Sequence, residues 1–390
     1  MASQSQTPAS AGYPTDRDPS LVDWMELFFD LIFVALVGQL AHGLDADPTV
    51  KTLLVFLALF ASVWWWWVNL TFIVNLSADL TRRQLSAAML VAMFAVGTIA
   101  VAAPEATGNR AWLFAAGNAM IRLLLLFMWL RRKRRGGGGS WVRIVLYNGL
   151  TALLWLVSIW VDAPVSYVLW TVAIVIEVVM LVVTTGGWGA GAMASFNVEH
   201  LSERFGLLVI IVLGESVLSI VTTLDGSFTL AGGVTAATAL VIVSGLAWSF
   251  FLYSADALRV GLEGLVESGQ VYTIRDTVAF LPFLLIAGVT MIAGAVSVAI
   301  HRPQHALPVA SAISLGGGIA LFFIANAVIS LRFGASVARV LRWALPAVGL
   351  PLVLIPVAIA VHGELAIIAA AVVVVFVVTS AELSARQAAA

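Results

Sequence analysis

Carboxylic acids lie inside apolar stretches of this sequence, where water cannot solvate their charge. Glu26 and Asp30 stand in the segment MELFFDLIFV (25–34), and Glu215 stands in the segment LGES (213–216). A charged group is costly to bury in such a stretch, so it marks either a binding site or an internal ion pair. Glu26 and Asp30 are four residues apart and would share one face of a helix. These acids are therefore the first candidates for chemistry.

The elements that must position these acids follow from the hydrophobic pattern. The chain has 390 residues, of which 61% are hydrophobic and 11% are charged, against about 45–50% and about 25% in soluble domains. About 20 apolar residues of helix cross a bilayer core of about 30 Å. Runs of this length occur near 24–44, 52–76, 84–103, 111–130, 141–161, 165–185, 204–224, 230–255, 274–300, 307–331, 337–361 and 364–382. The sequence therefore predicts an all-α, polytopic integral membrane protein with twelve transmembrane helices.

The distribution of basic residues predicts the orientation of these helices. If the N-terminus is cytoplasmic, sixteen of the twenty Lys and Arg residues fall in cytoplasmic segments, and only Lys51, Arg110 and Arg302 fall in outer loops. Cytoplasmic loops of membrane proteins carry this excess, so both termini are predicted to be cytoplasmic. The basic cluster Arg131–Arg135 is predicted to be a cytoplasmic anchor that can contact anionic lipid. A net charge of −1 provides no basic field for a nucleic-acid partner.

Two stretches of sequence recur at a single spacing of 177 residues. ELFFDLIFVALVGQL (26–40) aligns with ERFGLLVIIVLGESV (203–217), and SADLTR (77–82) aligns with SADALR (254–259). A third match, between 113–121 and 321–329, has a spacing of 208 residues. The pattern predicts two parallel six-helix repeats related by a pseudo-twofold axis along the membrane normal, a plan found in transporters.

The repeat divides the chain into five segments. Residues 23–185 form the first predicted repeat, and residues 204–382 form the second. A cytoplasmic segment, 186–203, connects them. The polar residues 1–22 are expected to be a disordered cytoplasmic tail, and residues 383–390 a short cytoplasmic tail.

Charged residues that recur in both repeats are best explained as structural ion pairs. Glu26 aligns with Glu203, and Arg82 aligns with Arg259. We therefore predict the pairs Glu26–Arg82 and Glu203–Arg259 at the cytoplasmic edge, where an acid also favours a helix N-terminus. Arg122 and Glu177 lie at similar depth in the fourth and sixth spans, about 12 Å from the cytoplasmic helix ends. They form a third predicted pair.

Acids that do not recur are better candidates for function. Asp30 aligns with Leu207, and Glu215 aligns with Gly38. Glu215 lies about 18 Å along its span, where it could carry a proton or hold a cation. The structural alternative is a neutral glutamic acid bonded to a backbone carbonyl. The candidate ion- or substrate-binding residues are Asp30, Glu215, Ser216 and Gln39.

Other motifs carry weaker signals. Glu199, His200 and Glu203 contain one histidine, which is a poor basis for a metal site, and the chain has no cysteine. No G-x-S-x-G nucleophile motif is present, so we expect no enzyme activity, no metal and no cofactor. The run WWWW (64–67) points its rings in four directions around a helix, so some are expected to face lipid and others the bundle.

MELFFDLIFV, the later ERFGLLVIIVLGES and the twelve predicted spans resemble the bacterial low-temperature-requirement protein A family, over roughly residues 20–385. The residues that match the family motif are Glu26, Phe28, Phe29, Asp30, Phe33, Glu203, Phe205, Gly214, Glu215 and Ser216. This resemblance implies a bacterial inner-membrane protein linked to growth in the cold, and it implies no particular substrate. A fainter likeness is to a potassium-channel family whose repeats begin with Phe-Ser-Asp. Phe29 here replaces that serine, and the second repeat has Gly206-Leu207 instead.

These observations predict a transporter of a small solute or ion, in which Asp30 and Glu215 are the groups that could couple transport to protons. One alternative is an ion channel with the same two-repeat plan. Another is a membrane-integral sensor or structural protein for cold adaptation, which would keep all its acids paired. The observation that separates them is whether Asp30 and Glu215 face a shared, water-sized cavity between the halves.

Overall fold

The computed structural model describes residues 24–77, 80–136, 140–184 and 197–389, and within these ranges the protein is all-helical. Twelve helices are long and apolar enough to cross a membrane, and they coincide with the twelve predicted runs. The predicted tail 1–22 and most of the connecting segment 186–203 lie outside the described residues, whereas the last helix continues through 383–389.

Among the described residues, nine of the spans are built on one α-helix each, the third of which continues into a short 3₁₀ turn (Ala103–Glu105), and three are composite. The single ones are α1 (Trp24–Ala46), α2 (Val50–Asn75), α3 (Arg82–Ala102), α4 (Ala111–Arg134), α7 (Val165–Thr184), α9 (Val198–Gly226), α14 (Val309–Arg332), α15 (Val337–Ala360) and α16 (Gly363–Ala389). The fifth span joins α5 (Trp141–Arg143) to α6 (Thr151–Val157) through a π-helical turn. The eighth joins α10 (Leu230–Ser249) to α11 (Ala255–Glu267), and the ninth joins α12 (Val271–Ala279) to α13 (Leu281–His301).

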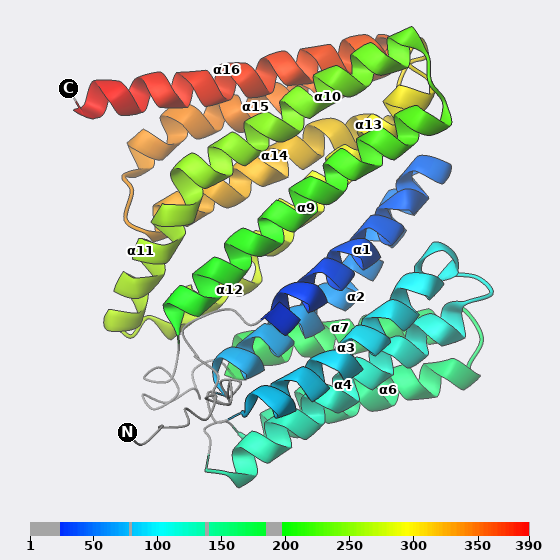
Figure 1. Ribbon diagram of the computed structural model, residues 1–390, viewed down its shortest axis with the longest axis vertical. Helices are drawn as coiled ribbons and strands as arrows, with labels where there is room; N and C mark the ends of the chain where they lie inside the picture. The colour runs from blue at the N-terminus through cyan, green and yellow to red at the C-terminus, as the bar shows by residue number, and fades with distance from the viewer. Residues whose placement is uncertain (1–23, 78–79, 137–139, 185–196, 390) are drawn as a thin grey trace, which may run out of the picture.

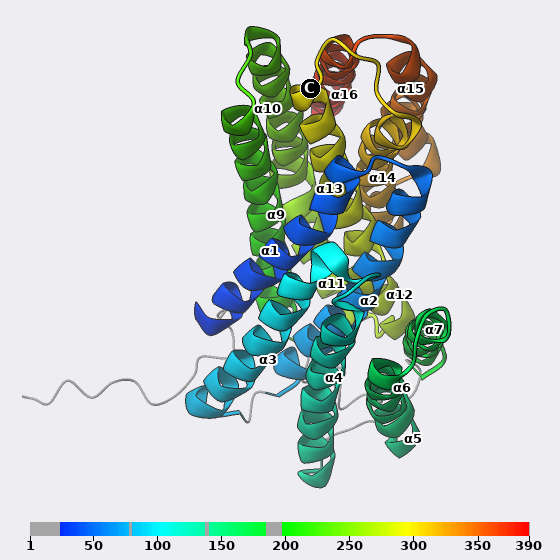
Figure 2. The ribbon, with the colours of Figure 1, turned by 90° about the vertical axis from the view of Figure 1, so that its right-hand side faces the viewer.

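The helices form two groups in chain order. Helices α1–α7 lie on one side, and α9–α16 lie on the other (Figure 1). Helix α1 lies where the groups meet, packed on α3 of its own group and on α9 and α13 of the other. A view from the side shows α1 crossing between the two groups (Figure 2). Any site that both groups build must therefore involve α1, α9 and α13.

Helix α2 runs through the interior. It contacts α1, α4, α7, α9, α13 and α14, and the side chains of Trp64, Trp65, Trp66 and Trp67 are all buried. The expectation that some of these rings face lipid is therefore wrong. The sequence shows in which directions the rings point, but it does not show that other helices cover every side of α2.

Close helix packing in the second group depends on glycine. A Cβ atom built on Gly288 of α13 would fall 2.5 Å from the carbonyl oxygen of Gly318 on α14, and one on Gly318 would fall 2.6 Å from that of Gly288. No larger residue fits at either position. Small residues bring helices together in this way in membranes, where the hydrophobic effect does not drive their association.

Large apolar side chains remain exposed on the outer helix faces. Phe94 of α3 and Phe127 of α4 are 71% and 65% exposed. A water-soluble protein rarely exposes apolar surface on this scale. Together with the twelve apolar helices, this outer surface is that of a multi-pass membrane protein, in which lipid covers these side chains.

Candidate functional site

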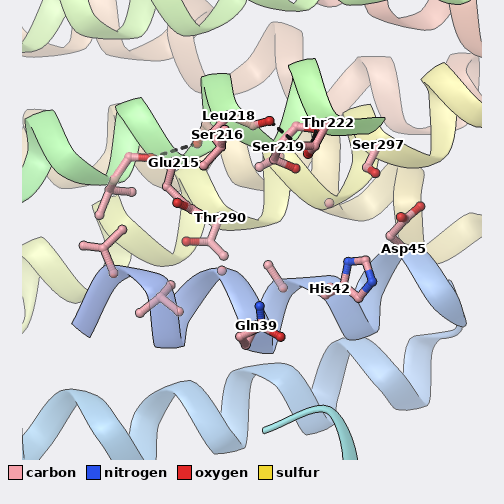
Figure 3. Close-up of a pocket in the computed structure, with 17 residues that line it drawn as sticks. Gln39, His42, Asp45, Glu215, Ser216, Leu218, Ser219, Thr222, Thr290 and Ser297 are labelled. Atoms are coloured by element: carbon pink, nitrogen blue, oxygen red, sulfur yellow. Dashed lines mark hydrogen bonds between the residues drawn. The ribbon is translucent and has the colours of Figure 1, made fainter. Parts of the chain in front are cut away.

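A cavity of about 350 Å³ lies between α1, α9 and α13, where the two helix groups meet. Three of the four predicted binding residues line it: Gln39 from α1, and Glu215 and Ser216 from α9. Figure 3 shows polar side chains of the three helices along its length. The other polar lining residues are His42, Asp45, Ser219, Thr222, Thr290 and Ser297.

The cavity has a polar mouth, and valine side chains and Glu215 line its inner end. Asp45 lies one residue from the end of α1, and His301 Nδ1, at the end of α13, lies 3.4 Å from Asp45 Oδ1. His42, one turn deeper, is exposed. Val34 and Val37 form part of the opposite end and are buried. The cavity therefore leads from the end of the bundle at which α1 and α13 finish towards the middle of α1.

Glu215 is the only acid in the interior part of the cavity, among the residues that the structure describes. It is half-buried, and no described residue donates a hydrogen bond to it or forms an ion pair with it. Its Oε1 atom lies 2.6 Å from the position that a Cβ on Gly38 would take. The glycine thus leaves room for the carboxylate against α1. Ser216 is buried beside it and donates a hydrogen bond to the carbonyl oxygen of Val212, at 3.0 Å.

Asp30 does not face this cavity. It is fully buried and accepts hydrogen bonds from Arg204 Nε at 3.0 Å, from Arg204 Nη2 at 3.0 Å and from Trp67 Nε1 at 2.9 Å. Asp30 and Glu215 therefore do not share a cavity, although both were candidate binding residues. Asp30 is instead paired, away from the cavity, with Arg204, the residue that directly follows Glu203 in the sequence.

Glu26 joins the same cation. Its Oε2 atom accepts a hydrogen bond from Arg204 Nη1 at 3.0 Å and lies 3.3 Å from His200 Nε2. The predicted partner, Arg82, is exposed at the start of α3, whereas Glu26 is fully buried. Glu26 thus pairs across the two helix groups with α9, and the predicted pairing within the first group is corrected.

The second predicted strut is also replaced. Glu203 is exposed, and Arg259 bonds to Glu263 of its own helix at 3.0 Å. This is an ordinary i,i+4 surface pair, in which each side chain is nearly half exposed. The sequence similarity between these two segments does not produce a similar ion pair.

The third predicted pair is present. Arg122 Nε lies 2.6 Å from Glu177 Oε1, and Arg122 Nη2 lies 2.9 Å from Glu177 Oε2. The other guanidinium hydrogens go to Asn118 and to the carbonyl oxygen of Ser62. All five N–H groups of Arg122 are therefore bonded, and the side chain also stacks over the ring of Trp155 at 5.0 Å. The pair ties α4 to α7 and α2, away from the cavity.

Glu26, Asp30, Trp67, His200 and Arg204 form one connected group, which we call the Arg204 network. The guanidinium carbon of Arg204 also lies 5.5 Å from the centre of the Trp67 ring. The network joins α1, α2 and α9 at the end opposite the cavity mouth, since it involves the first two turns of α1 and the start of α9. His200, considered above as a metal ligand, instead faces Glu26 and lies near Asn75.

A buried apolar layer separates the network from the cavity. Along α1, Asp30 is followed by Phe33, Val34 and Val37, and along α9, Arg204 is followed by Leu208 and Val212 before Glu215. These apolar side chains are at most 3% exposed. The site is thus open at one end and closed at the other, first by apolar packing and then by ion pairs.

The sequence contains a further signal for the cavity, in the spacing of polar residues along three spans. Polar residues recur every three positions at 39, 42 and 45 on α1 and at 216, 219 and 222 on α9, while Thr290 and Ser297 are seven apart on α13. Each set lies along one helix face. Polar stripes of this kind inside apolar spans indicate a lined cavity.

A sequence model of the family described as "Bacterial low temperature requirement A protein (LtrA)" matches residues 21–380. The "Uncharacterized protein RA0937" of Rhizobium meliloti (strain 1021) is 28% identical over 214 residues. That match covers 53% of this chain and 52% of the relative, so it spans about half of each. No solved structure matches the chain. With twelve apolar spans and a family match over nearly its whole length, this multi-pass membrane protein belongs to the bacterial low temperature requirement A family.

Proposed function

We propose that the protein is a carrier that moves a small solute or ion across the bacterial cytoplasmic membrane. The observation that supports this most directly is the polar cavity between α1, α9 and α13, open at one end and closed at the other. A carrier exposes one central site to one side of the membrane at a time. In one of its two states, a carrier must have a site that is open to one side of the membrane and separated from the other side by an apolar layer. The cavity and the buried apolar layer are arranged in this way.

The packing of the helices supports a carrier built from two repeats. In the first group α1 packs on α3 and α2 on α7, and in the second group α9 packs on α13 and α10 on α16. These are corresponding helices if each group starts from the similar segments 26–40 and 203–217. Relative motion of two such bodies about a site between them is the usual basis of alternating access.

The distribution of basic residues predicts how this carrier is oriented in the membrane. With cytoplasmic termini, the cavity mouth at the C-terminal end of α1 faces outward, and the Arg204 network closes the cytoplasmic side. The basic residues Arg131–Arg135 then lie at the cytoplasmic surface. There, Arg131 already bonds to Gln84 Oε1 at 2.8 Å, and the cluster would contact anionic lipid.

The charged groups have separate roles in this scheme. Glu215 faces the cavity without a partner among the described residues, so it is the group that could bind the cargo or carry a coupling proton. Asp30 and Glu26 are both held by Arg204. Opening the cytoplasmic side would require these ion pairs to separate or move together, which makes the network the inner gate.

Single-cysteine labelling tests the carrier. Because the chain has no cysteine, a Ser219→Cys variant has one thiol, which lies in the cavity. A membrane-impermeant maleimide should label it from the outside in right-side-out vesicles, and also from the cytoplasmic side in inside-out vesicles as the site alternates. A Val221→Cys variant on the lipid-exposed face of the same helix is the control and should stay unlabelled.

The result would distinguish the three functions considered. Labelling from the outside only, under all conditions, would oppose a carrier and favour a sensor or structural role. Labelling from both sides together with single-channel current steps in planar bilayers would indicate a channel. The buried apolar layer between Asp30 and Glu215 argues against a channel, since the described residues between Asp30 and Gly38 on α1, and between Arg204 and Glu215 on α9, carry no polar side chain.

A further inference from the structure

We propose that the cavity binds a small organic monovalent cation with N–H groups, namely a protonated primary amine. That such a cation is also the transported cargo depends on the function proposed above. Binding itself does not depend on it, and the two can be tested separately.

The charged side chains that line the cavity have one sign. They are Glu215 at the inner end and Asp45 at the mouth, and none of the described residues that line it is Lys or Arg. Two histidines are nearby: His42 lines the cavity, and His301 lies 3.4 Å from Asp45. Asp45 thus has a neighbouring histidine, whereas Glu215 has no partner among the described residues. A cleft with this charge concentrates cations and repels anions.

The hydroxyl groups of the cavity provide a second, independent argument for a cation. Ser216 donates its proton to the carbonyl oxygen of Val212, Thr222 to that of Leu218 and Thr290 to that of Ile286, at 2.8–3.0 Å. Each bond runs back four residues within a helix. A hydroxyl has one proton to donate and two lone pairs, so these three side chains offer the cavity only acceptors. The hydroxyl of Ser297 lies 2.9 Å from that of Thr223, and either group can be the donor of this hydrogen bond.

This lining matches a ligand that donates hydrogen bonds. Gln39, His42, Ser219 and Ser297 are the lining side chains that can still donate, whereas Glu215, Asp45 and the hydroxyls of Ser216, Thr222 and Thr290 accept. An anion such as a carboxylate or phosphate would meet an excess of acceptors and two negative charges. A primary ammonium group has three N–H donors and one positive charge, as lysine does.

The size and the apolar part of the lining favour an organic cation. A volume of about 350 Å³ is at the lower end of small-molecule sites, which span roughly 300–1,000 Å³. Val37, Val212 and Leu218 provide apolar surface for a short hydrocarbon chain. None of the described lining residues is Phe, Tyr or Trp, so the aromatic cage that suits a quaternary ammonium ion is lacking.

Isothermal titration calorimetry on the full-length protein in detergent, in amine-free phosphate buffer, tests this inference. We expect n-butylammonium to bind with one-to-one stoichiometry. Butyrate, which has the same chain with the opposite charge, should not bind, and tetramethylammonium, which lacks N–H groups, should bind at least tenfold more weakly. Potassium should not displace butylammonium at equal concentration.

Variants assign the binding to this site. Glu215→Gln should weaken butylammonium binding at least tenfold, which corresponds to about 1.4 kcal/mol. Thr290→Val keeps the side-chain shape but removes one acceptor, and should weaken binding about threefold. It tests the site even if Glu215→Gln folds poorly. Glu203→Gln, which removes an exposed acid of the same helix, is the matched control and should bind as the native protein does.

Binding of butyrate, or native affinity in Glu215→Gln and Thr290→Val, would overturn the inference. Binding of potassium without butylammonium would overturn the assignment to an amine. Butylammonium binding that persists while the Ser219→Cys thiol is labelled from one side only would leave the cation site in place and refute the carrier. Two-sided labelling without butylammonium binding would do the reverse.

Discussion

Gly38 on α1 and Glu215 on α9 are in contact, although they stand 177 residues apart at corresponding positions of the two similar segments. A Cβ atom on Gly38 would lie 2.6 Å from Oε1 of Glu215. In an arrangement with a twofold axis, a residue touches its own counterpart only close to that axis. The contact therefore supports the pseudo-twofold relation, and it would place the axis at the cavity. At the cavity, Glu215 provides a carboxylate, and Gly38 provides the space for it.

A Gly38→Ala variant should separate the fold from the site. The new methyl group meets only the end of the Glu215 side chain, which can move, and alanine favours a helix by about 1 kcal/mol relative to glycine. We expect the thermal unfolding temperature to change little. Butylammonium binding should fall several-fold, because the carboxylate must leave its position. Gly206→Ala, on α9 with open space around the new methyl group, is the control for both measurements, and unchanged binding in Gly38→Ala would contradict the assigned position of Glu215.

The Arg204 network predicts a loss of stability when one carboxylate is removed. Asp30→Asn eliminates the charge that faces Arg204 Nε and Nη2 and leaves a buried guanidinium with Glu26 as its acid. Because Glu26 still compensates the charge of Arg204, the cost is that of buried hydrogen-bonding groups losing a partner, about 1–3 kcal/mol. We expect a loss of this size in the free energy of unfolding, measured by denaturant titration in detergent.

An exposed ion pair provides the comparison for this measurement. Glu263→Gln breaks the surface pair with Arg259, and exposed pairs contribute about 0–1 kcal/mol. If Asp30→Asn cost no more than Glu263→Gln, the network would not hold α1, α2 and α9 together, and its role as an inner gate would fail.

The length of apolar runs predicted the twelve helices because the thickness of a bilayer fixes how many residues a span needs. The same reasoning found Glu215, since an acid in the middle of a span has few structural explanations. The partners of Glu26 and Asp30 were not predictable in this way. Arg204 is 178 and 174 residues away from them. The repeat suggested that Glu26 pairs within its own half, and it suggested no partner for Asp30. Only the packing of α1 against α9 brings these three side chains together.

The Arg122–Glu177 pair allows a test of what a buried ion pair contributes. Glu177→Gln alone should destabilise by about 3–5 kcal/mol, because it leaves the fully buried Arg122 without its counter-ion. Replacing both, as Arg122→Met with Glu177→Gln, removes two charges that are costly to bury, and should be less destabilising than the sum of the Arg122→Met and Glu177→Gln single changes. A double-mutant cycle by denaturant unfolding measures this coupling. Additive losses would show that Arg122 is held by Asn118 and Ser62 and not by Glu177.

Two neighbouring tryptophans separate the hydrogen bond to Asp30 from the packing of the aromatic core. Trp66 and Trp67 are both fully buried, and both pack against Phe33, with ring centres at 5.5 and 5.7 Å. Trp67 Nε1 donates to Asp30, whereas Trp66 Nε1 has no hydrogen-bond partner among the described residues. Replacing either by phenylalanine removes a similar volume, but only Trp67→Phe takes a donor from a buried carboxylate.

We therefore expect Trp67→Phe to lower the free energy of unfolding by about 1–3 kcal/mol more than Trp66→Phe does, which is the cost of an unsatisfied buried polar group. The Ser219→Cys labelling assay adds a functional comparison. If the network closes the inner side, Trp67→Phe should speed labelling from the cytoplasmic side and Trp66→Phe should not. Equal effects of the two substitutions on both stability and labelling would mean that the aromatic packing alone, and not the bond to Asp30, keeps that end closed.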